Sequence, residues 1–378
     1  MDLRRFPDVE GPGLQASDAA DRLLLDETAP LRASTAPGRL VVVDDSYGAL
    51  TLGAVSQGAG EVRVHQDLIT GERALAANAR RLSDTLSDGG FTSLPLAPET
   101  FDGATAVLLR LPRSLDRLAE VSAMIAAHAD PTVTVAAGGR IKHMSTSMND
   151  VLLTVFDRVD VSRARQKSRM LTATGPRRDA ALDAAARWPR TETHRSPTVP
   201  DGGLVVAAHG GVFAGTGIDI GTRFLLEQVG AMPEVSSALD LACGTGIVAA
   251  VLALTRPGLT VTATDRSAAA AASAAATARL SGVDRRVDVV RADGTETLAA
   301  SSQPLILLNP PFHSDAAVST GIAGHLFADA ARALAPGGEL WCVWNSHLRY
   351  RPALERIVGP TRQVARNAKF TITASTRL

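Results

Sequence analysis

Short runs of apolar, β-branched residues alternate with segments of helical apolar spacing along the second half of the chain. The short runs predict buried strands at residues 237–242, 259–264, 287–291, 304–308 and 339–344. Helices are predicted from Ile247 and over the alanine-rich stretch Ala268–Ala278, because alanine favours the helix more than any other residue. Strands and helices in this alternation are typical of a doubly wound α/β sheet.

The first half of the chain repeats the pattern, with strands predicted at residues 40–43, 62–67 and 106–109. Polar residues at the strand ends match between the halves at offsets of 196, 198 and 199 residues: Asp44 with Asp240, Asp67 with Asp265, and Arg110 with Asn309. Near-equal offsets predict two tandem copies of one α/β domain. Proline and glycine interrupt residues 171–203, so we place the domains at residues 1–195 and 196–378.

The two copies differ at the strand ends, where ligands bind in sheets of this kind. The second copy has a glycine-rich turn, Cys243-Gly244-Thr245-Gly246, and later an Asn-Pro-Pro-Phe sequence. At the corresponding places the first copy has Asp45-Ser46-Tyr47 and Arg110-Leu111-Pro112. Glycine lets the backbone approach a ligand that a tyrosine would block. We therefore expect the first copy to be degenerate and to serve as a scaffold or substrate platform.

Charge is distributed unevenly, although the 378-residue chain has a formal net charge of zero at pH 7. Residues 1–160 carry a net −7, residues 161–200 a net +6, and residues 349–378 another +6. The zero sum therefore does not exclude a nucleic acid, and we expect RNA binding to depend on the two basic segments. The basic residues at 163, 165, 167 and 169 alternate with a period of two, which fits either a solvated strand face or an RNA-facing edge.

Composition narrows the class of protein further. With 45% hydrophobic and 21% charged residues, the chain can bury a sizeable core. Its two cysteines, Cys243 and Cys342, are too few for a disulfide scaffold, and no cysteine or histidine cluster has zinc spacing. The first residues lack the apolar stretch of a signal peptide, and no apolar run is long enough to span a membrane. We expect a cytoplasmic protein with no metal and no membrane partner.

Acidic residues lie at the ends of neighbouring predicted strands in the second copy. Asp240 precedes the glycine-rich turn, Asp265 follows the next strand, and Asp293 follows the third. A carboxylate at Asp265 can accept both hydroxyls of a ribose, and one at Asp293 can accept from an adenine amine. Each aspartate taken alone is more typical of a helix N-cap. Their common position beside a glycine-rich turn favours a nucleoside-containing cofactor.

The sequence Asn309-Pro310-Pro311-Phe312 is the most specific signal in the chain. Two prolines stiffen the loop and leave its carbonyls free to accept. The amide oxygen of Asn309 and the carbonyl of Pro310 can each accept a hydrogen from one planar amine, which directs the nitrogen lone pair toward an electrophile. Phe312 can stack on a planar substrate, or the turn can pack it in the core. His313 is either a general base or a residue of loop packing.

Together these motifs resemble a known family. The set LDLACGTG, TDRS, RADG and LNPPFH is similar to class I S-adenosylmethionine-dependent methyltransferases that modify exocyclic amines. Residues Gly211–Gly221 are similar to the tandem-domain bacterial rRNA guanine-N2 methyltransferases. N-terminal pieces such as Asp44–Leu50 and Leu111–Leu115 resemble the large-subunit (23S) member of that family. The likeness covers nearly the whole chain.

The resemblance implies two tandem Rossmann-like methyltransferase domains, the second catalytic and the first a degenerate copy that helps to grip RNA. It implies methylation of the N2 amine of a guanine in rRNA, naked or in an assembly intermediate, with Asn309, Pro310 and Phe312 at the reacting base. Because that amine is a weak nucleophile, the reaction needs alignment more than a strong base. The residues expected at the cofactor, S-adenosyl-L-methionine, are Thr216, Asp219, Thr222, Asp240, Ala242, Cys243, Gly244, Gly246, Asp265, Arg266, Asp293, Gly294 and Asn309.

The chain departs from the family pattern at two places, and other functions stay open. Ala242 stands where many methyltransferases have a glycine, and Ala214-Gly215 replaces the more usual Ser-Arg. The target can instead lie in small-subunit rRNA, or be a glutamine side chain, since the same Asn-Pro-Pro chemistry serves an amide. A glutamine target explains the loop but not the degenerate first copy or the basic segment. The last alternative is a catalytically silent RNA-binding protein with a vestigial cofactor pocket.

Overall fold

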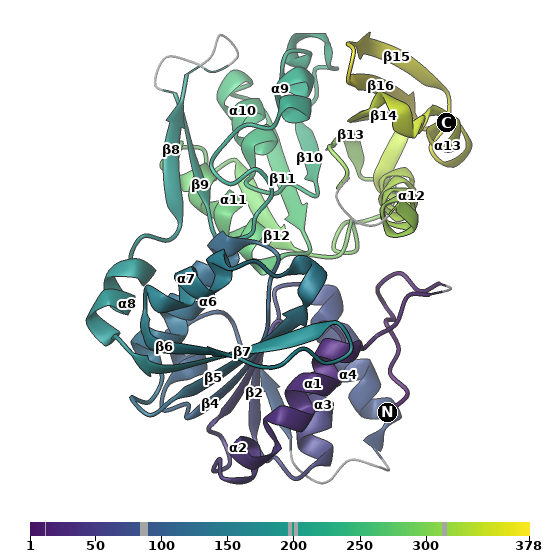
Figure 1. Ribbon diagram of the computed structural model, residues 1–378. Coiled ribbons are helices and arrows are strands. Elements are labelled where there is room, and N and C mark those ends of the chain that lie inside the picture. The colour runs from purple at the N-terminus through teal and green to yellow at the C-terminus, as the bar shows by residue number, and fades with distance from the viewer. Residues whose placement is uncertain (12, 84–89, 196–198, 200–202, 312–315) are drawn as a thin grey trace. The chain divides into compact units, whose positions relative to one another are not determined.

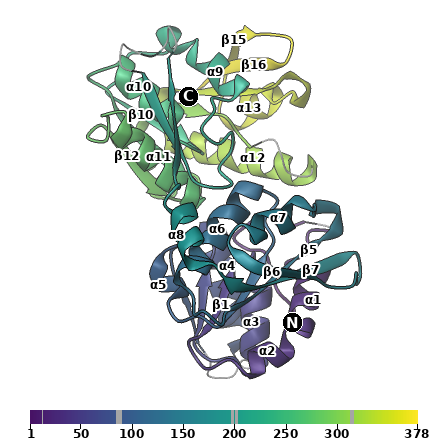
Figure 2. The ribbon, with the colours of Figure 1, turned by 60° about the vertical axis from the view of Figure 1, so that its left-hand side comes forward.

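The chain folds into two compact units, Met1–Trp188 and Pro189–Leu378, each built around its own sheet (Figure 1 and Figure 2). The computed structural model describes the whole chain except residues 12, 84–89, 196–198, 200–202 and 312–315. The sequence pattern predicted a border after residue 195. It lies earlier because β8 (Arg190–His194) pairs with β9 (Leu204–Ala208) and so belongs to the second unit.

The first unit contains a seven-stranded sheet in the order β3-β2-β1-β4-β5-β7-β6. The neighbouring strands β3, β2, β1, β4 and β5 pair in parallel, and β7 is antiparallel to both of its neighbours, β5 and β6. The strands are β1 (Leu40–Val43), β2 (Val62–His65), β3 (Phe91–Ser93), β4 (Ala106–Arg110), β5 (Thr134–Arg140), β6 (Phe156–Val161) and β7 (Ser168–Pro176). The helices are α1 (Ala19–Glu27), α2 (Ala29–Ala33), α3 (Ala49–Ser56), α4 (Ile69–Arg81), α5 (Pro98–Phe101), α6 (Leu115–His128), the short 3-10 helix η2 (Ile141–His143), α7 (Ser147–Leu153) and α8 (Arg178–Ala185).

The second unit repeats this architecture, with the order β12-β11-β10-β13-β14-β16-β15. Here β16 is the antiparallel strand. The strands are β10 (Ser237–Leu241), β11 (Thr260–Asp265), β12 (Val287–Arg291), β13 (Gln303–Leu308), β14 (Leu334–Asn345), β15 (Thr361–Arg366) and β16 (Phe370–Thr376). The helices are α9 (Ile220–Leu226), η3 (Val229–Ala231), α10 (Ile247–Thr255), α11 (Ala268–Leu280), α12 (Ala316–Ala333), η4 (Ser346–Leu348) and α13 (Arg351–Ile357). Two sheets with one strand order confirm the tandem α/β domains that the sequence predicted.

Helices cover both faces of each sheet, so the central strands are buried on both sides. In the first unit, one face packs against α1, α3 and α4, and the other against α5 to α8. In the second unit, α9, α10 and α11 pack with β9 on one face of the sheet, while α12 and α13 lie on the other (Figure 1). No described helix is long and apolar enough to cross a membrane.

The pairing registers correct two of the three correspondences predicted between the copies. Val43, the last residue of β1, pairs with His65, the last residue of β2. Leu241, the last residue of β10, pairs with Thr264, the residue before Asp265. Asp44 therefore corresponds to Ala242 and not to Asp240. By the same register Gln66, rather than Asp67, corresponds to Asp265. Asp44 and Ala242 both have a left-handed φ, 58° and 57°, so both copies turn sharply at the same point.

The third correspondence, Arg110 with Asn309, is confirmed. The last residue of β1 pairs with Leu109, and the last residue of β10 pairs with Leu308. Arg110 and Asn309 therefore occupy equivalent positions at the carboxyl edges of the two sheets.

The basic segment after residue 160 is not the strand face that its alternating pattern suggested. Arg163, Arg165 and Lys167 lie in the turn between β6 and β7, and only Arg169 lies on a strand. Gln166 and Lys167 have φ angles of 48° and 59°, which a strand cannot contain. Downstream, β7 and α8 fill residues that the proline and glycine content had assigned to the domain boundary, and both belong to the first unit.

One strand of the second sheet is longer than predicted. The sequence pattern starts it at residue 339, after a turn at Pro336-Gly337-Gly338, but β14 begins at Leu334. The turn residues form an irregular stretch within the strand, where its pairing with β13 shifts register between Gln303 and Leu305. The other predicted strands of this unit agree with the structure to within one residue at each end.

Candidate active site

The glycine-rich turn after β10 has one glycine that packing requires and one that borders open space. Gly246 has a φ of 72°, and a Cβ there would lie 2.8 Å from the Cβ of Ala274 on α11. Gly244 has a φ of 55°, and a Cβ there would meet no described atom within 4 Å. Gly246 therefore lets α10 and α11 pack closely, whereas Gly244 leaves its backbone open to a ligand. Ala242 has the same left-handed backbone with a methyl group added.

Asp240, near the end of β10, contacts the helix that follows the glycine-rich turn. Its buried carboxylate accepts, through Oδ2, the backbone N–H of Ala249 in the first turn of α10, at 3.0 Å. Burial, followed by the nearby carboxylate of Asp265, raises the pKa of Asp240 to about 7. One oxygen of Asp240 thus satisfies a backbone N–H in the first turn of α10, although the N-cap residue of that helix is Gly246.

Asp265 is held directly beside the glycine-rich turn. Its Oδ2 accepts the backbone N–H of Gly244 at 3.0 Å, and its Oδ1 accepts that of Ser267 at 2.9 Å. The side chain is only half-buried, so a ligand at the turn can reach it. Arg266, also half-buried, follows it in the chain. The half-buried Cys243 thiol has a pKa raised by burial and by the two neighbouring carboxylates, so it stays protonated at neutral pH.

Asp293 lies next to Asp265, as the sequence predicted from their neighbouring strands. The backbone N–H of Ala292 donates to the carbonyl of Asp265 at 2.9 Å, which continues the pairing of β12 with β11. The backbone N–H of Asp293 donates to Oε1 of Glu296 at 3.0 Å. Its carboxylate is half-buried, and its Oδ2 lies 3.9 Å from Nε2 of His325.

Two residues of α12, His325 and Asp329, lie beside the turn that follows β12, although no sequence motif marked them. His325 lies 3.5 Å from the carboxylate of Asp329, one helical turn away. A Cβ on Gly294, which has a φ of 61°, would lie 1.7 Å from Oδ2 of Asp329, so only glycine fits there. Burial raises the pKa of Asp329. The sequence pattern predicted no helix here, so the i,i+4 spacing of this histidine and aspartate carried no signal without α12.

Asn309 is the most constrained side chain of the site. It follows β13, and its Nδ2 donates to Oγ1 of Thr222 at 3.0 Å and to Oδ2 of Asp219 at 3.4 Å. Because an ionised carboxylate can only accept, Asp219 fixes which end of the amide faces α9. The amide oxygen, Oδ1, is buried and has no hydrogen-bond partner among the described residues. The site therefore holds an oriented acceptor that no described residue of the chain satisfies.

Asp219 and Thr222 are themselves positioned by the start of α9. Asp219 is the N-cap residue, and its Oδ2 accepts the backbone N–H groups of Gly221 and Thr222 at 2.9 and 3.3 Å. The family resemblance led us to expect both residues at the cofactor. The structure places them against the amide of Asn309, a role that the motif alone did not reveal.

The remaining predicted residues lie as follows. Oγ1 of Thr216 donates to Glu192 at 2.8 Å, and the carbonyl oxygen of Thr216 lies 2.7 Å from Nε2 of His194. Both contacts hold Thr216 against β8. Pro310 is buried directly after Asn309. Phe312 and His313 lie outside the described residues. Among the described residues, no group of three or more His, Cys, Asp or Glu could hold a metal ion.

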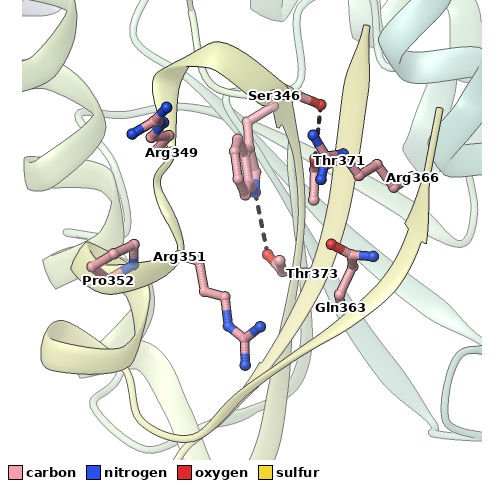
Figure 3. Close-up of a pocket in the computed structure, with 9 residues that line it drawn as sticks. Ser346, Arg349, Arg351, Pro352, Gln363, Arg366, Thr371 and Thr373 are labelled. Atoms are coloured by element: carbon pink, nitrogen blue, oxygen red, sulfur yellow. Dashed lines mark hydrogen bonds between the residues drawn. The ribbon is translucent and has the colours of Figure 1, made fainter. Parts of the chain in front are cut away.

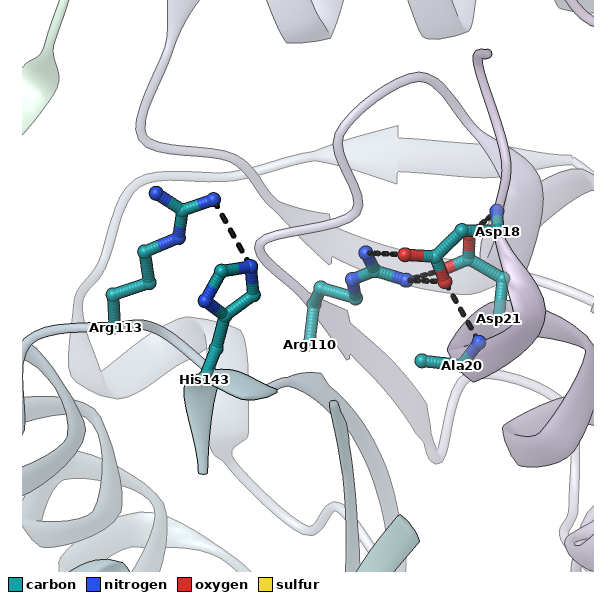
Figure 4. Close-up of polar contacts among 6 residues, drawn as sticks. All are labelled: Asp18, Ala20, Asp21, Arg110, Arg113 and His143. Carbon is teal, nitrogen blue, oxygen red and sulfur yellow. Dashed lines mark hydrogen bonds and ion pairs between the residues drawn. The ribbon is translucent and has the colours of Figure 1, made fainter. Parts of the chain in front are cut away.

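The first unit keeps the geometry of this site but replaces its acceptor with a cation (Figure 4). Arg110, at the position of Asn309, donates to both carboxylate oxygens of Asp18 at 2.9 Å and also to Asp21. Asp18 is the N-cap residue of α1, as Asp219 is of α9, and Asp21 stands three residues later, as Thr222 does. A guanidinium has five donors and no acceptor, so this position cannot receive an amine hydrogen.

The rest of the first-unit site is also filled by the protein itself. Asp44, the counterpart of Ala242, is paired with the buried Arg117 at 2.9 Å. Although burial opposes ionisation, Arg117 holds the pKa of Asp44 below its ordinary value. The hydroxyl of Tyr47 donates to Asp8 at 2.7 Å, where the second unit has its glycine-rich turn. These contacts explain physically why the first copy is degenerate.

A seven-stranded sheet with one antiparallel strand beside its edge defines the class I methyltransferase fold, which both units share. Only the second unit has the glycine-rich turn after β10. Residues 203–374 match the family model of the methyltransferase small domain, and residues 1–177 match that of the RLMG N-terminal domain. Proteins named ribosomal RNA large subunit methyltransferase G, from Pseudomonas paraeruginosa and Streptomyces avermitilis, are each 34% identical to this chain. The matches cover 98% of this chain and 96% and 95% of those proteins. The chain belongs to this family of large-subunit rRNA methyltransferases.

A solved structure shares the architecture across both units. It is a 16S rRNA N2 methyltransferase of T. thermophilus in complex with AdoMet and guanosine. The TM-score is 0.77 over 98% of this chain and 97% of that chain, at 19% sequence identity. This likeness shows the tandem fold.

Proposed function

We propose that the chain uses S-adenosyl-L-methionine to methylate the exocyclic N2 amine of a guanine in large-subunit rRNA. One observation carries the proposal: the amide of Asn309 is fixed by Thr222 and Asp219, while its oxygen is buried without a donor among the described residues. A buried acceptor left unpaired costs about 1–3 kcal/mol, so a substrate N–H that reaches it is bound favourably.

The acceptors at this position suit a planar amine. Oδ1 of Asn309 and the carbonyl oxygen of Pro310 can each accept one hydrogen of an NH2 group, and proline has no N–H that would compete. Holding both hydrogens orients the nitrogen and stabilises the positive charge that develops on it during transfer. A base in a duplex must leave its stack to reach the loop, which costs a few kcal/mol.

The glycine-rich turn and the acidic strand ends fit the methyl donor. Gly244 leaves its backbone open, Asp265 presents a fixed carboxylate to a ribose, and Asp293 lies beside it where an adenine amine can be met. When bound, the donor supplies a methyl group on a positively charged sulfur. The carboxylate of Asp265 adds negative charge on the side of the turn where that sulfonium would bind.

The first unit is proposed to grip RNA rather than to catalyse. Its carboxyl sheet edge carries the exposed Arg113 and Lys142, with His143 beside them; Nη2 of Arg113 lies 3.2 Å from Nε2 of His143 (Figure 4). Basic side chains at that edge match a phosphate backbone, while Arg110, paired with Asp18 and Asp21, cannot accept an amine hydrogen as Asn309 can.

Incubation of the full chain with radiolabelled methyl donor and separate unmodified 23S and 16S transcripts tests the proposal. We expect label in the 23S transcript, and its loss in Asn309→Ala. Asn149→Ala, which removes a half-buried asparagine of the first unit, serves as the matched control and should keep activity. Label found only in 16S rRNA or only in protein would contradict the proposed substrate, and full activity of Asn309→Ala would contradict the proposed site.

A further inference from the structure

A second concave site of the catalytic unit lies at the same sheet edge as Asn309. Beyond the end of β13, its neighbour β14 continues to Asn345, which pairs with Phe370 at the start of β16. Arg366, the last residue of β15, pairs with Thr371. Strand pairing therefore gathers the ends of these three strands at the carboxyl edge. Strand spacing puts β16 roughly 10 Å from β13 along that edge.

A cavity of ≈ 360 Å³ opens there, a volume within the range of ligand sites (Figure 3). The largely buried indole of Trp344 forms one wall, and its Nε1 donates to Oγ1 of Thr373 at 3.4 Å. The hydroxyls of Ser346 and Thr371 lie 2.8 Å apart on the adjoining wall. The cavity thus has an indole on one wall and the hydroxyl groups of Ser346, Thr371 and Thr373 around it.

Three arginines surround these hydroxyls: Arg349, Arg351 and Arg366. Arg351 donates through Nε to Glu355 at 2.8 Å. Within the described part of the chain, no carboxylate is paired with Arg349 or Arg366, and no acidic residue lines the cavity. Two exposed guanidinium groups without counter-charges therefore flank a cluster of hydroxyls, which is the chemistry that binds phosphate oxygens.

The backbone holds these arginines in defined places. Arg349 ends η4 in the left-handed conformation, with φ 50° and ψ 47°, which is uncommon for a residue other than glycine or asparagine. At the tip of the β15–β16 hairpin, Oδ1 of Asn367 accepts the backbone N–H groups of Lys369 and Phe370 at 2.9 and 2.7 Å. These bonds fix the turn that directly follows Arg366.

We propose that this cavity binds a backbone phosphate of the rRNA strand whose guanine enters the Asn309 site. The inference rests on the proposed function and adds the subsite that holds the substrate strand. Hydroxyl and guanidinium donors at a fixed distance from the reacting base set the register of the strand. Phosphate contacts of this kind position a nucleic acid without reading its sequence.

The test compares the double variant Arg349→Asn/Arg366→Gln with the charge-matched control Arg279→Gln/Arg285→Gln. Asparagine adopts the left-handed backbone at position 349, so the turn is kept. Arg279 and Arg285 are exposed residues of the same unit that neither line the cavity nor belong to the two basic segments. Filter binding of the full-length proteins to an unmodified 23S transcript is measured over a series of salt concentrations, together with methylation kinetics.

We expect the double variant to bind the transcript about tenfold more weakly or worse than the control at low salt. The slope of log affinity against log salt should become shallower by about 0.7 for each single-strand phosphate that the variant no longer neutralises. At saturating RNA, kcat should stay within about twofold of the control, because the catalytic amide is intact. Affinity for the methyl donor, measured by calorimetry, should not change.

Equal affinity and equal salt slope in the two variants would overturn the inference while the wild type still methylates RNA. Titration with inorganic phosphate separates a second source of the same chemistry. If the double variant loses phosphate binding but keeps RNA affinity, the cavity is a free-anion site and the inference is wrong. Failure of the wild type to methylate any rRNA is a different result, and it would count against the proposed function.

Discussion

Thr222 is expected to control catalysis without touching the substrate, by orienting Asn309. Thr222→Val removes the hydroxyl to which Nδ2 of Asn309 donates at 3.0 Å and keeps the shape of the side chain. The amide then retains only the longer bond to Asp219, at 3.4 Å. Its oxygen is held less firmly toward the incoming amine, so fewer bound substrates are aligned for transfer.

The expected magnitude follows from one neutral hydrogen bond. Such a bond contributes about 0.5–1.5 kcal/mol, and about 1.4 kcal/mol is a factor of ten in rate. We therefore expect kcat to fall by about two- to twelvefold. KM for the methyl donor should change little, because Thr222 bonds to the catalytic amide rather than to the turn that carries Gly244.

Steady-state methylation of a 23S transcript measures these constants. Thr222→Ser, which restores the hydroxyl, should recover most of the rate, whereas a purely packing role would not be rescued. Thr255→Val removes a hydroxyl at the far end of α10, bonded to the carbonyl of Val251 at 2.8 Å, and serves as the control. If Thr222→Val is as active as Thr255→Val while Asn309→Ala is inactive, the orienting role is refuted.

Three further predictions concern stability and RNA binding. Burial raises the pKa of Asp240 to about 7, so the folded chain keeps a proton that the unfolded chain releases above about pH 4. The stability that this proton contributes is complete below about pH 4 and falls by at most about 1.4 kcal/mol per pH unit up to about pH 7. Asp240→Asn should flatten that fall, measured by urea unfolding at pH 5 and 8. An unchanged pH dependence in the variant would contradict this prediction. Gly246→Ala should lower the free energy of unfolding by about 1–3 kcal/mol more than Gly244→Ala. Both glycines have a left-handed φ, but only a Cβ at position 246 would collide with Ala274. Equal losses of stability in the two variants would contradict this steric clash. Charge reversal at Arg163, Arg165 and Arg169 should weaken RNA affinity and flatten its salt dependence, both measured by filter binding. Both quantities stay unchanged if this segment is only a solvated surface.

The fold was predictable because apolar runs and turn residues are local signals. Strands β10 to β13, most of β14 and the tandem repeat could be derived from them, whereas β8, β9, β15 and β16 were not predicted. The domain border was not, because it depends on β8 pairing with β9 across residues 195–203. The alternation at residues 163–169 was misleading for a similar reason: side-chain pattern alone does not show the positive φ at Gln166 and Lys167 that turns the chain.

The candidate site was predictable only where a motif follows a strand. Asp265, Asp293 and Asn309 each lie at a strand end, and the structure gathers them at one edge. The partners of Asn309 could not be predicted, because Thr222 lies 87 residues away and reaches the amide only when α9 packs on the sheet. The same holds for Arg110 and Asp18, which are 92 residues apart.

The most direct test of the central claim is the identity of the methylated nucleoside. Unmodified 23S transcript is treated with the full chain and labelled donor, digested to nucleosides and separated by chromatography with mass detection. The account predicts that label co-elutes with N2-methylguanosine and disappears in Asn309→Ala. Label in any other nucleoside, such as one methylated at a ring nitrogen or a ribose hydroxyl, would contradict it, because the fixed amide oxygen of Asn309 is suited to an exocyclic amine.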